Sequence, residues 1–429
     1  MPGMPPVAFA AAAAVFVGTG VVSTICAQVL IYAGAGDSWT MLLPFSNYLG
    51  MLLSGLVPDS LLGGEGPPLE KPGKPPPPPP PGGGAWALLQ RLADVPRGVA
   101  PRGGGGAPPG TLTVRASTYV LIAVVADILG FWLHVQGIKY AGSALFQVVY
   151  CSVVVWSALG YWFARTPRGS RLLLGAGLAE FATPPAPGGD AAPGLELTPP
   201  QQGGIALVLG GLAVVALNEG SGSAHGAHAG GGVALVLYGL LCSIACAMCY
   251  GCVYTFAELL MGAPAPPRVQ AVAARVGGGV TALLGAYVVL FTVPRLKEVG
   301  ARVAAAGLLT PQQVALGYGV MVASAVAHSV TYFQLMGAAG AVSTSVMAAA
   351  RAVGVFVVSA ALFCADAARP RAAGALAALA QESQCFTAAR GVATASVCVG
   401  IVVYARGKVA AAKAAAAAAP PGAGDVAHA

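Results

Sequence analysis

Long apolar runs that recur along the whole chain constrain this sequence more than any other feature. About ten stretches, most of them roughly 17 to 25 residues long, are apolar enough for a helix that crosses a bilayer. Charged residues make up only 9% of the 429 residues, whereas soluble domains carry about 25%, so lipid must cover much of the surface. The predicted spans are residues 7–31, 40–58, 117–137, 142–163, 204–218, 232–257, 277–294, 313–335, 341–364 and 389–405. The sequence therefore predicts an all-α, polytopic membrane protein with about ten transmembrane helices.

Polar segments separate these runs unevenly. Residues 59–116 contain the proline run 75–81 and the glycines 103–106, and such a composition stays extended and flexible. We expect a disordered linker there, a disordered loop at 165–203, and a disordered basic, Ala-rich tail at 406–429. For the tail after Lys408, a fraying helix is the alternative. The remaining parts are the first two helices in 1–58, the rest of a first repeat in 117–218, and a second five-helix repeat in 232–405.

The positive charges in the loops predict the orientation. If the N-terminus lies in the cytosol and ten spans follow, fourteen of the 22 Lys and Arg residues fall in cytosolic segments and seven on the opposite side. Positively charged loops tend to stay in the cytosol. We therefore expect a multi-pass integral membrane protein with both termini cytosolic, and the choice of membrane stays open.

Two segments 200 residues apart share one layout. The first, WLHVQGIKYAGSALFQVVYC, starts at Trp132, and the second, YFQLMGAAGAVSTSVMAAAR, starts at Tyr332. Each has an aromatic helix end, a tight Gly/Ala turn and a helix that opens with small residues, which let helices approach closely in lipid. Because each half would hold five spans, an odd number, the halves would be oppositely oriented. This predicts two inverted five-helix repeats with a substrate site near the membrane midplane.

The chain resembles the drug/metabolite transporter superfamily, including its EamA-like and nucleotide-sugar transporter branches. The segments that carry the resemblance are ADILGFWLHVQGIKYAGSALFQVVYCSVVVWSALGYWF, GIALVLGGLAVVALNEG and the closing FTAARGVATASVCVGIVVYARGK. Many members end the fourth and ninth spans with a Glu-Arg or Glu-Lys pair, whereas these ends read FARTPRG and FCADAARP here. The resemblance implies ten helices and alternating access without fixing the substrate.

Two ionisable residues lie inside predicted spans, Asp127 in the third and Arg351 in the ninth. A charge at the bilayer centre costs about 2.5 to 3.5 kcal/mol on insertion scales, so such residues point to function. The Arg351 guanidinium suits a carboxylate or phosphate, and Asp127 suits a cation or a proton. The alternative is a buried Asp127–Arg351 pair that fixes helix packing.

Uncharged polar residues extend this candidate site. Gln147 and Tyr150 share a helix face with Cys151, which the 200-residue offset matches to Arg351, and Pro44 predicts a kink in the second span. The full set of candidate substrate-binding residues is Arg351, Asp127, Gln147, Tyr150, Tyr332, His328, Trp132 and Asn47. For each uncharged residue, interhelical hydrogen bonding is the alternative.

Several other motifs carry less weight. Gly34 to Asp37 matches the Gly-x-Gly-Asp pattern of intramembrane aspartyl proteases, with Asp127 as a partner, but the pattern recurs by chance at residues 422–425. Four cysteines on one face of the sixth span suit packing better than a tetrahedral metal site. The sequence has no basic stripe with interleaved aromatics, so nucleic-acid binding is excluded, and it has no Walker A lysine motif for ATP-driven transport.

These patterns favour a secondary transporter that moves a small polar or anionic metabolite by alternating access. We expect no cofactor, no metal and no catalytic residue, and the partners are a small-molecule substrate and membrane lipid. A homodimer stays open, because lipid-facing and partner-facing surfaces look alike in such a sequence. The alternatives are a non-transporting membrane scaffold or receptor and, less favoured, an intramembrane aspartyl protease.

Overall fold

The computed structural model describes residues 6–57, 112–141, 143–181, 198–222, 233–261, 267, 269–364 and 388–418. Most of these residues are helical. Six helices in these ranges are long and apolar enough to cross a membrane, namely Val7–Tyr32, Ala116–Ala141, Leu145–Arg165, Ala234–Met261, Gln270–Ala306 and Pro311–Met336. Leu42–Leu56 and Gly391–Gly407 are shorter apolar helices. The predicted all-α membrane class is therefore confirmed. In lipid a helix satisfies its own backbone hydrogen bonds, which explains why these apolar runs are helical.

Twelve α-helices of four or more residues are assigned in the described parts of the chain. The first part of the chain forms α1 (Pro6–Tyr32), α2 (Leu42–Leu53), α4 (Ala116–Ala141), α5 (Ser143–Tyr150), α6 (Val153–Arg165) and α7 (Pro167–Gly175). The second part forms α8 (Pro199–Gly222), α9 (Val233–Met261), α10 (Val269–Tyr287), α11 (Leu296–Ala306), α12 (Pro311–Cys364) and α13 (Ala388–Ala418). Short turns of helix occur at Ser38–Thr40, Ser54–Leu56 and Val288–Arg295, and β1 (Leu112–Thr113) pairs antiparallel with β2 (Glu180–Phe181).

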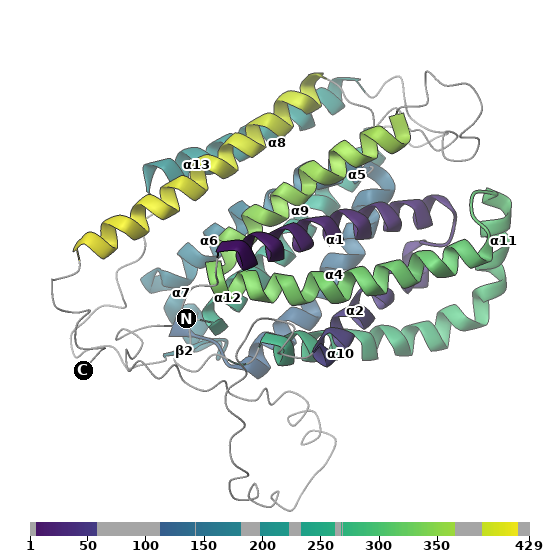
Figure 1. Ribbon diagram of the computed structural model, residues 1–429, viewed down its shortest axis with the longest axis horizontal. Helices are drawn as coiled ribbons and strands as arrows, with labels where there is room; N and C mark the ends of the chain where they lie inside the picture. Colours follow the sequence, from purple (N-terminus) through teal and green to yellow (C-terminus); the bar gives the residue numbers. More distant parts are fainter. Residues whose placement is uncertain are drawn as a thin grey trace, which may run out of the picture.

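A tight turn divides α12 into two arms, residues 311–339 and 341–364. Gly340 has φ 79° and ψ 170°, a backbone conformation that only glycine adopts without strain, and the arms diverge from it (Figure 1). Earlier in the chain α4 ends at Ala141 and α5 begins at Ser143. The Gly340 turn lies in the Gly/Ala stretch of the second of the two similar segments, where a turn was predicted.

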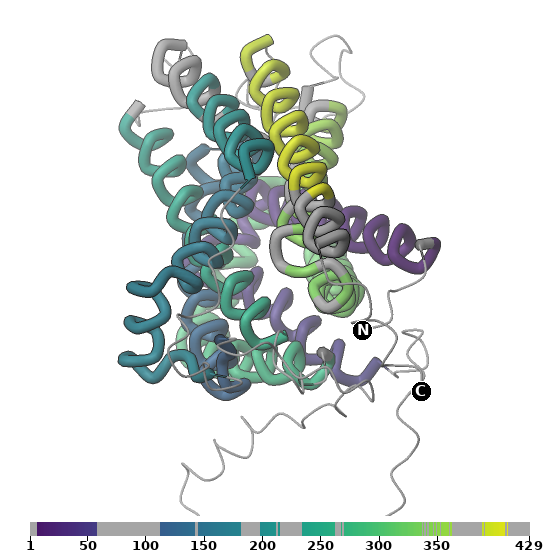
Figure 2. The backbone as a smooth tube through the Cα atoms, turned by 90° about the vertical axis from the view of Figure 1, so that its left-hand side faces the viewer, coloured from purple at the N-terminus to yellow at the C-terminus, as the bar shows by residue number. Residues whose placement is uncertain are grey.

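Helices far apart in the sequence pack against one another along most of their length. The main pairs are α1 with α12, α4 with α9, and α8 with α13, while α2 lies against both α10 and α12. In Figure 1 these helices form one bundle, and α8 and α13 run together along one of its edges. Figure 2 shows the same pair from the side, α13 in yellow beside α8 in teal.

The α8–α13 contact depends on two glycines that face each other. A Cβ atom at Gly204 would lie 2.5 Å from the Gly400 carbonyl oxygen, and one at Gly400 would lie 2.6 Å from the Gly204 carbonyl oxygen. Both distances are far below van der Waals contact, so only glycine permits this crossing. Small residues allow such close backbone approach in membranes, where packing rather than hydrophobicity drives helix association.

Two sequence-based expectations need correction. Part of the predicted disordered loop 165–203 is ordered: α7 begins after Thr166, whose hydroxyl accepts a hydrogen bond from the Gly169 amide at 3.0 Å, and α8 already begins at Pro199. Pro44 does not kink the second span, because it lies in the first turn of α2, where proline is tolerated. In the tail 406–429 the helical alternative holds as far as Ala418, where α13 ends, and the alanines there are the best helix formers.

Other expectations fall outside the described residues. Of the predicted linker 59–116, residues 59–111 are not described, and neither are residues 182–197 of the predicted loop or 419–429 of the tail. The described part of the linker contains β1, which pairs with β2 and places Arg115 Nε 2.7 Å from Glu180 Oε2. Together with α7, this pair lies at the end of the bundle where α1 begins and α13 ends, and α11 lies at the opposite end (Figure 1).

Candidate functional site

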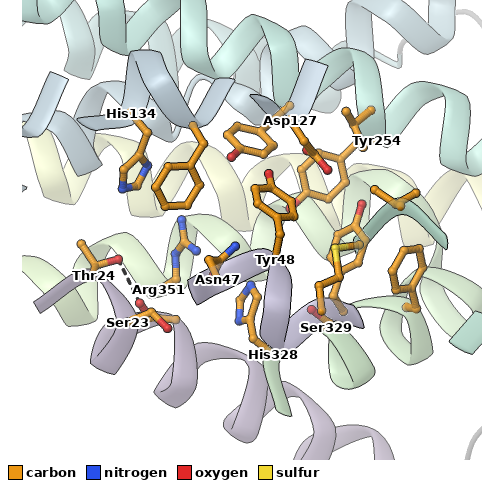
Figure 3. Close-up of a pocket in the computed structure, with 18 of the residues that line it drawn as sticks. Ser23, Thr24, Asn47, Tyr48, Asp127, His134, Tyr254, His328, Ser329 and Arg351 are labelled. Atoms are coloured by element: carbon orange, nitrogen blue, oxygen red, sulfur yellow. Dashed lines mark hydrogen bonds between the residues drawn. The ribbon is translucent and has the colours of Figure 1, made fainter. Parts of the chain in front are cut away.

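A cavity of about 150 Å³ lies inside the bundle, between α1, α2, α4, α5, α9, α10 and α12. Its wall contains one basic and one acidic residue, Arg351 and Asp127, together with polar and aromatic side chains. Figure 3 shows Arg351 reaching the cavity from α12 and Asp127 from α4. The space is large enough for several ordered water molecules or a small solute.

Arg351 lies on the second arm of α12, between two features that accommodate its long side chain. On one side a Cβ atom at Gly20 of α1 would overlap the Arg351 Cδ atom, so this glycine leaves room for the arginine. On the other side the guanidinium carbon lies 5.3 Å from the centre of the Tyr150 ring, a cation–π distance. The buried Nε atom has no hydrogen-bond partner among the described residues, which leaves a donor for a ligand.

Asp127 is buried in α4, with only 5% of its surface exposed. Tyr48, from α2, lines the same cavity. Within the described parts of the chain, ion pairs form between Arg115 and Glu180, Lys139 and Asp37, and Arg302 and Asp37. Asp127 and Arg351 belong to none of these pairs. The Asp127–Arg351 pair considered from the sequence is therefore not formed.

Tyrosine rings make up most of the aromatic wall. The Tyr150 and Tyr250 ring centres are 5.8 Å apart, and those of Tyr254 and Tyr332 are 5.3 Å apart, both in edge-on arrangements. Six tyrosines from five helices line the cavity, namely Tyr48, Tyr119, Tyr150, Tyr250, Tyr254 and Tyr332. They give the cavity both stacking faces and hydroxyl groups.

His328 and Asn47 also line the cavity, as predicted from their place inside the spans. The His328 Nδ1 atom lies 3.1 Å from the Phe16 carbonyl oxygen and 3.3 Å from the Thr19 hydroxyl, and its ring stacks on the Phe16 ring at 4.4 Å. These contacts hold the first arm of α12 against α1. His328 thus lines the cavity and also makes the interhelical contacts that the sequence analysis gave as the alternative to substrate binding.

Gln147 and Trp132 are placed differently from the other candidates. Gln147 is fully buried behind the cavity wall, and its Nε2 atom lies 3.4 Å from the hydroxyl of Thr24, which does line the cavity. Trp132 is half-buried and is not part of the wall. The structure therefore brings six of the eight candidates to one cavity and leaves these two outside it.

Sequence reasoning missed several wall residues, chiefly Tyr119, Tyr250 and Tyr254. Tyr250 and Tyr254 are four residues apart on α9, and this spacing places both on one helix face. The same spacing continues back to Cys246, which is fully buried. This row of residues with polar side-chain ends on an otherwise apolar helix could have predicted a cavity-facing surface. Tyrosines also occur at lipid interfaces, so the pattern is not specific.

At the α11 end of the bundle, an ionic network binds the loop between α1 and α2. Asp37 Oδ2 accepts a hydrogen bond from Arg302 Nη1 of α11 at 3.0 Å, and its Oδ1 lies 3.6 Å from Lys139 Nζ of α4. The Arg302 guanidinium lies 4.8 Å from the Trp39 ring centre, and the Tyr287 hydroxyl donates to the Trp39 carbonyl at 2.9 Å. This network, here called the Asp37 latch, holds the loop against three helices. Asp37 is not in the cavity wall that contains Asp127.

No protein-family model matches this sequence, and the curated proteins contain no match to it.

Proposed function

We propose that this protein is a secondary transporter that moves a small polar or anionic metabolite across a membrane by alternating access. The observation that carries the proposal is the cavity between membrane-crossing helices, with the unpaired charges Arg351 and Asp127 in its wall. Charged groups at membrane depth are costly and mark substrate or ion pathways. A solute that enters the cavity offsets part of this cost.

The helix contacts support an architecture of ten spans in two inverted five-helix halves. In this architecture α1, α2, α4 and α8 of the first half correspond to α9, α10, the first arm of α12 and α13 of the second half. Replacing each helix by its counterpart turns the α1–α12 contact into the α9–α4 contact, and both are extensive. The same exchange turns α2–α12 into α10–α4, and leaves α2–α10 and α8–α13 unchanged. All of these contacts are present. Inverted halves of this kind place a substrate site at their interface near the midplane.

The Asp37 latch supports alternating access from the two ends of the bundle. It ties the α1–α2 loop of the first half to α11 of the second half at the end opposite α7. Cavity residues such as Tyr119, Met51 and Val276 lie near the helix ends at the α7 side. In the proposed orientation, with both termini cytosolic, the latch closes the non-cytosolic end. Rocking of the halves would release it and expose the cavity to that side.

The resemblance to the drug/metabolite transporter superfamily agrees with this proposal. It rests on the small-residue patterns of spans three to five and on the last helix, and it implies ten helices and alternating access.

The test is solute uptake by proteoliposomes that contain the purified protein. Wild type is screened with a panel of small polar and anionic metabolites, with and without solute inside the vesicles, to detect exchange. Arg351→Ala is expected to lower uptake of an anionic solute at least about tenfold, because a charge-assisted contact contributes about 1.5 to 3 kcal/mol. Arg168→Ala is the matched control, since Arg168 is exposed on α7, and it should transport normally.

Three other outcomes of this experiment would each contradict part of the proposal. Unchanged uptake of every transported solute by Arg351→Ala would remove this residue from the site. If wild-type vesicles move no solute on the panel, a non-transporting scaffold or receptor becomes the better account. Peptide-bond cleavage that Asp37→Asn abolishes would instead indicate the aspartyl protease.

A further inference from the structure

We propose that the solute is a small zwitterion, with its cationic nitrogen facing Asp127 and its carboxylate facing Arg351. This inference rests on the proposed transport function and narrows its substrate class. It starts from one juxtaposition, namely two opposite charges in the wall of the same cavity that do not pair with each other.

The surroundings of Asp127 fit an organic ammonium group. Its carboxylate shares the cavity wall with six tyrosines, which come from five helices. A carboxylate among several aromatic rings is the arrangement that binds organic cations, because the ring faces and the acid attract the same positive group. Among the described residues, no Lys or Arg forms an ion pair with Asp127.

The surroundings of Arg351 fit the opposite group. Its Nε is a buried donor with no partner among the described residues, and the Tyr150 ring lies beside its guanidinium. Arginine presents several donors in a fixed plane and binds carboxylates through two parallel hydrogen bonds. The backing by Gly20 and Tyr150 limits the conformations of this side chain, so its donors are preorganised.

The size of the cavity limits the solute. Its volume of about 150 Å³ equals that of about five water molecules in the liquid. Because covalently bonded atoms pack more closely than separate water molecules, the cavity suits a solute of fewer than about ten non-hydrogen atoms. An amino acid with a small side chain or a short betaine satisfies this limit, and a nucleotide exceeds it.

A zwitterion would also couple the two halves of the protein, because it contacts one charge on each half. Asp127 lies on α4, and Arg351 lies on the second arm of α12, which belong to opposite halves in the proposed architecture. A solute that contacts both charges bridges the halves, whereas a simple anion or cation contacts one only. A ligand shifts a conformational equilibrium only through such differential contacts.

The experiment compares solutes of nearly equal shape and different charge on wild-type protein. Glycine betaine carries both charges, 3,3-dimethylbutanoate replaces its nitrogen by carbon and keeps only the anion, and choline keeps only the cation. Alanine tests a primary ammonium. Binding is measured by calorimetry and by the shift in melting temperature. Solute concentrations reach about 10 mM, ten times the upper end of common KM values.

At least one of the two zwitterions is expected to bind about tenfold or more tightly than both singly charged solutes, because each charge contact is worth at least that factor. Asp127→Asn should reduce this preference over the anion, and Arg351→Gln should reduce the preference over the cation. The wild-type comparison stands even if a variant fails to fold.

Two results would overturn the zwitterion inference. One is that neither glycine betaine nor alanine binds more tightly than both 3,3-dimethylbutanoate and choline, and the other is no binding of either zwitterion. In both cases uptake of some other solute by the same vesicles would leave the transport function intact. Failure of the transport proposal is separate, because it requires that no solute on the wider panel moves.

Discussion

The Asp37 latch is expected to control how often the cavity opens at the α11 end, and Asp37→Asn tests this directly. At 3.0 Å and an effective dielectric constant of about 20, the Asp37–Arg302 pair attracts by about 5 kcal/mol before solvation is considered. The two side chains are 27% and 36% exposed, so water and side-chain entropy reduce the net value to about 1 kcal/mol or less. Lys139 shares the same carboxylate at 3.6 Å. Loss of both contacts therefore weakens closure by about 1 to 2 kcal/mol in total, a five- to thirtyfold shift of the equilibrium.

Thiol labelling measures this shift. Ala27 is buried in the cavity wall, so the thiol of an Ala27→Cys variant, in a background without the native cysteines, reports opening. A membrane-impermeant reagent is added to the α11 side of the vesicles. The thiol of a Gly300→Cys variant on α11 identifies that side, because open space surrounds Gly300. Asp37→Asn should speed labelling at position 27 by about five- to thirtyfold.

The matched control breaks an ion pair at the other end of the bundle. Arg115→Ala removes the Arg115–Glu180 contact, which is 2.7 Å long and more exposed than the latch, and it should leave labelling from the α11 side unchanged. The reasoning fails if Asp37→Asn labels at the wild-type rate, or if both variants speed labelling equally.

Two further predictions use neighbouring glycines as paired controls. Gly20→Ala should abolish most uptake, because the new methyl group overlaps Arg351, while Gly18→Ala, which meets nothing within 4 Å, should keep wild-type uptake; equal uptake by the two variants would contradict the Arg351 placement. Gly204→Ala should destabilise the protein by about 1 to 3 kcal/mol through overpacking against α13, whereas Gly203→Ala has open space and should match or exceed wild-type stability. Melting temperatures in detergent measure the second effect, and a Gly204→Ala variant as stable as wild type would refute the close crossing.

The sequence was sufficient for the helical membrane class, because apolar length alone predicts a span and six of the described helices have that length and composition. Asp127 and Arg351 stand out in the sequence because charges are rare in such runs, and the structure places both in one cavity wall. The sequence could not reveal the tyrosines of this wall, since Tyr119 and Tyr254 look like ordinary apolar-helix residues until α4 and α9 are placed side by side. The Asp37 latch was missed for a related reason: Asp37 and Arg302 are 265 residues apart, and no local pattern links them.

The α7 segment shows a different limit. Proline and glycine near Arg165 suggested a disordered loop, yet a capped start at Thr166 and the apolar residues Leu172 and Leu173 produce a short helix. The capping residue is a local sequence signal, so the start of α7 could have been predicted. The β1–β2 pairing could not have been predicted, because two-residue strands form only against the partner that lies beside them.

The packing of α1 against α12 has a consequence for biosynthesis. The Thr19 hydroxyl contacts His328, which is 309 residues further along the chain, and the Ser23 hydroxyl donates to that of Ser324. At about 5 to 20 residues per second, a ribosome needs roughly 15 to 60 seconds to add that length, so α1 enters the bilayer long before its partner exists. Thr19 also donates to the Val15 carbonyl of its own helix at 2.7 Å, a bond that requires no second helix. The nascent first helix is thus able to wait in lipid with that hydroxyl already satisfied.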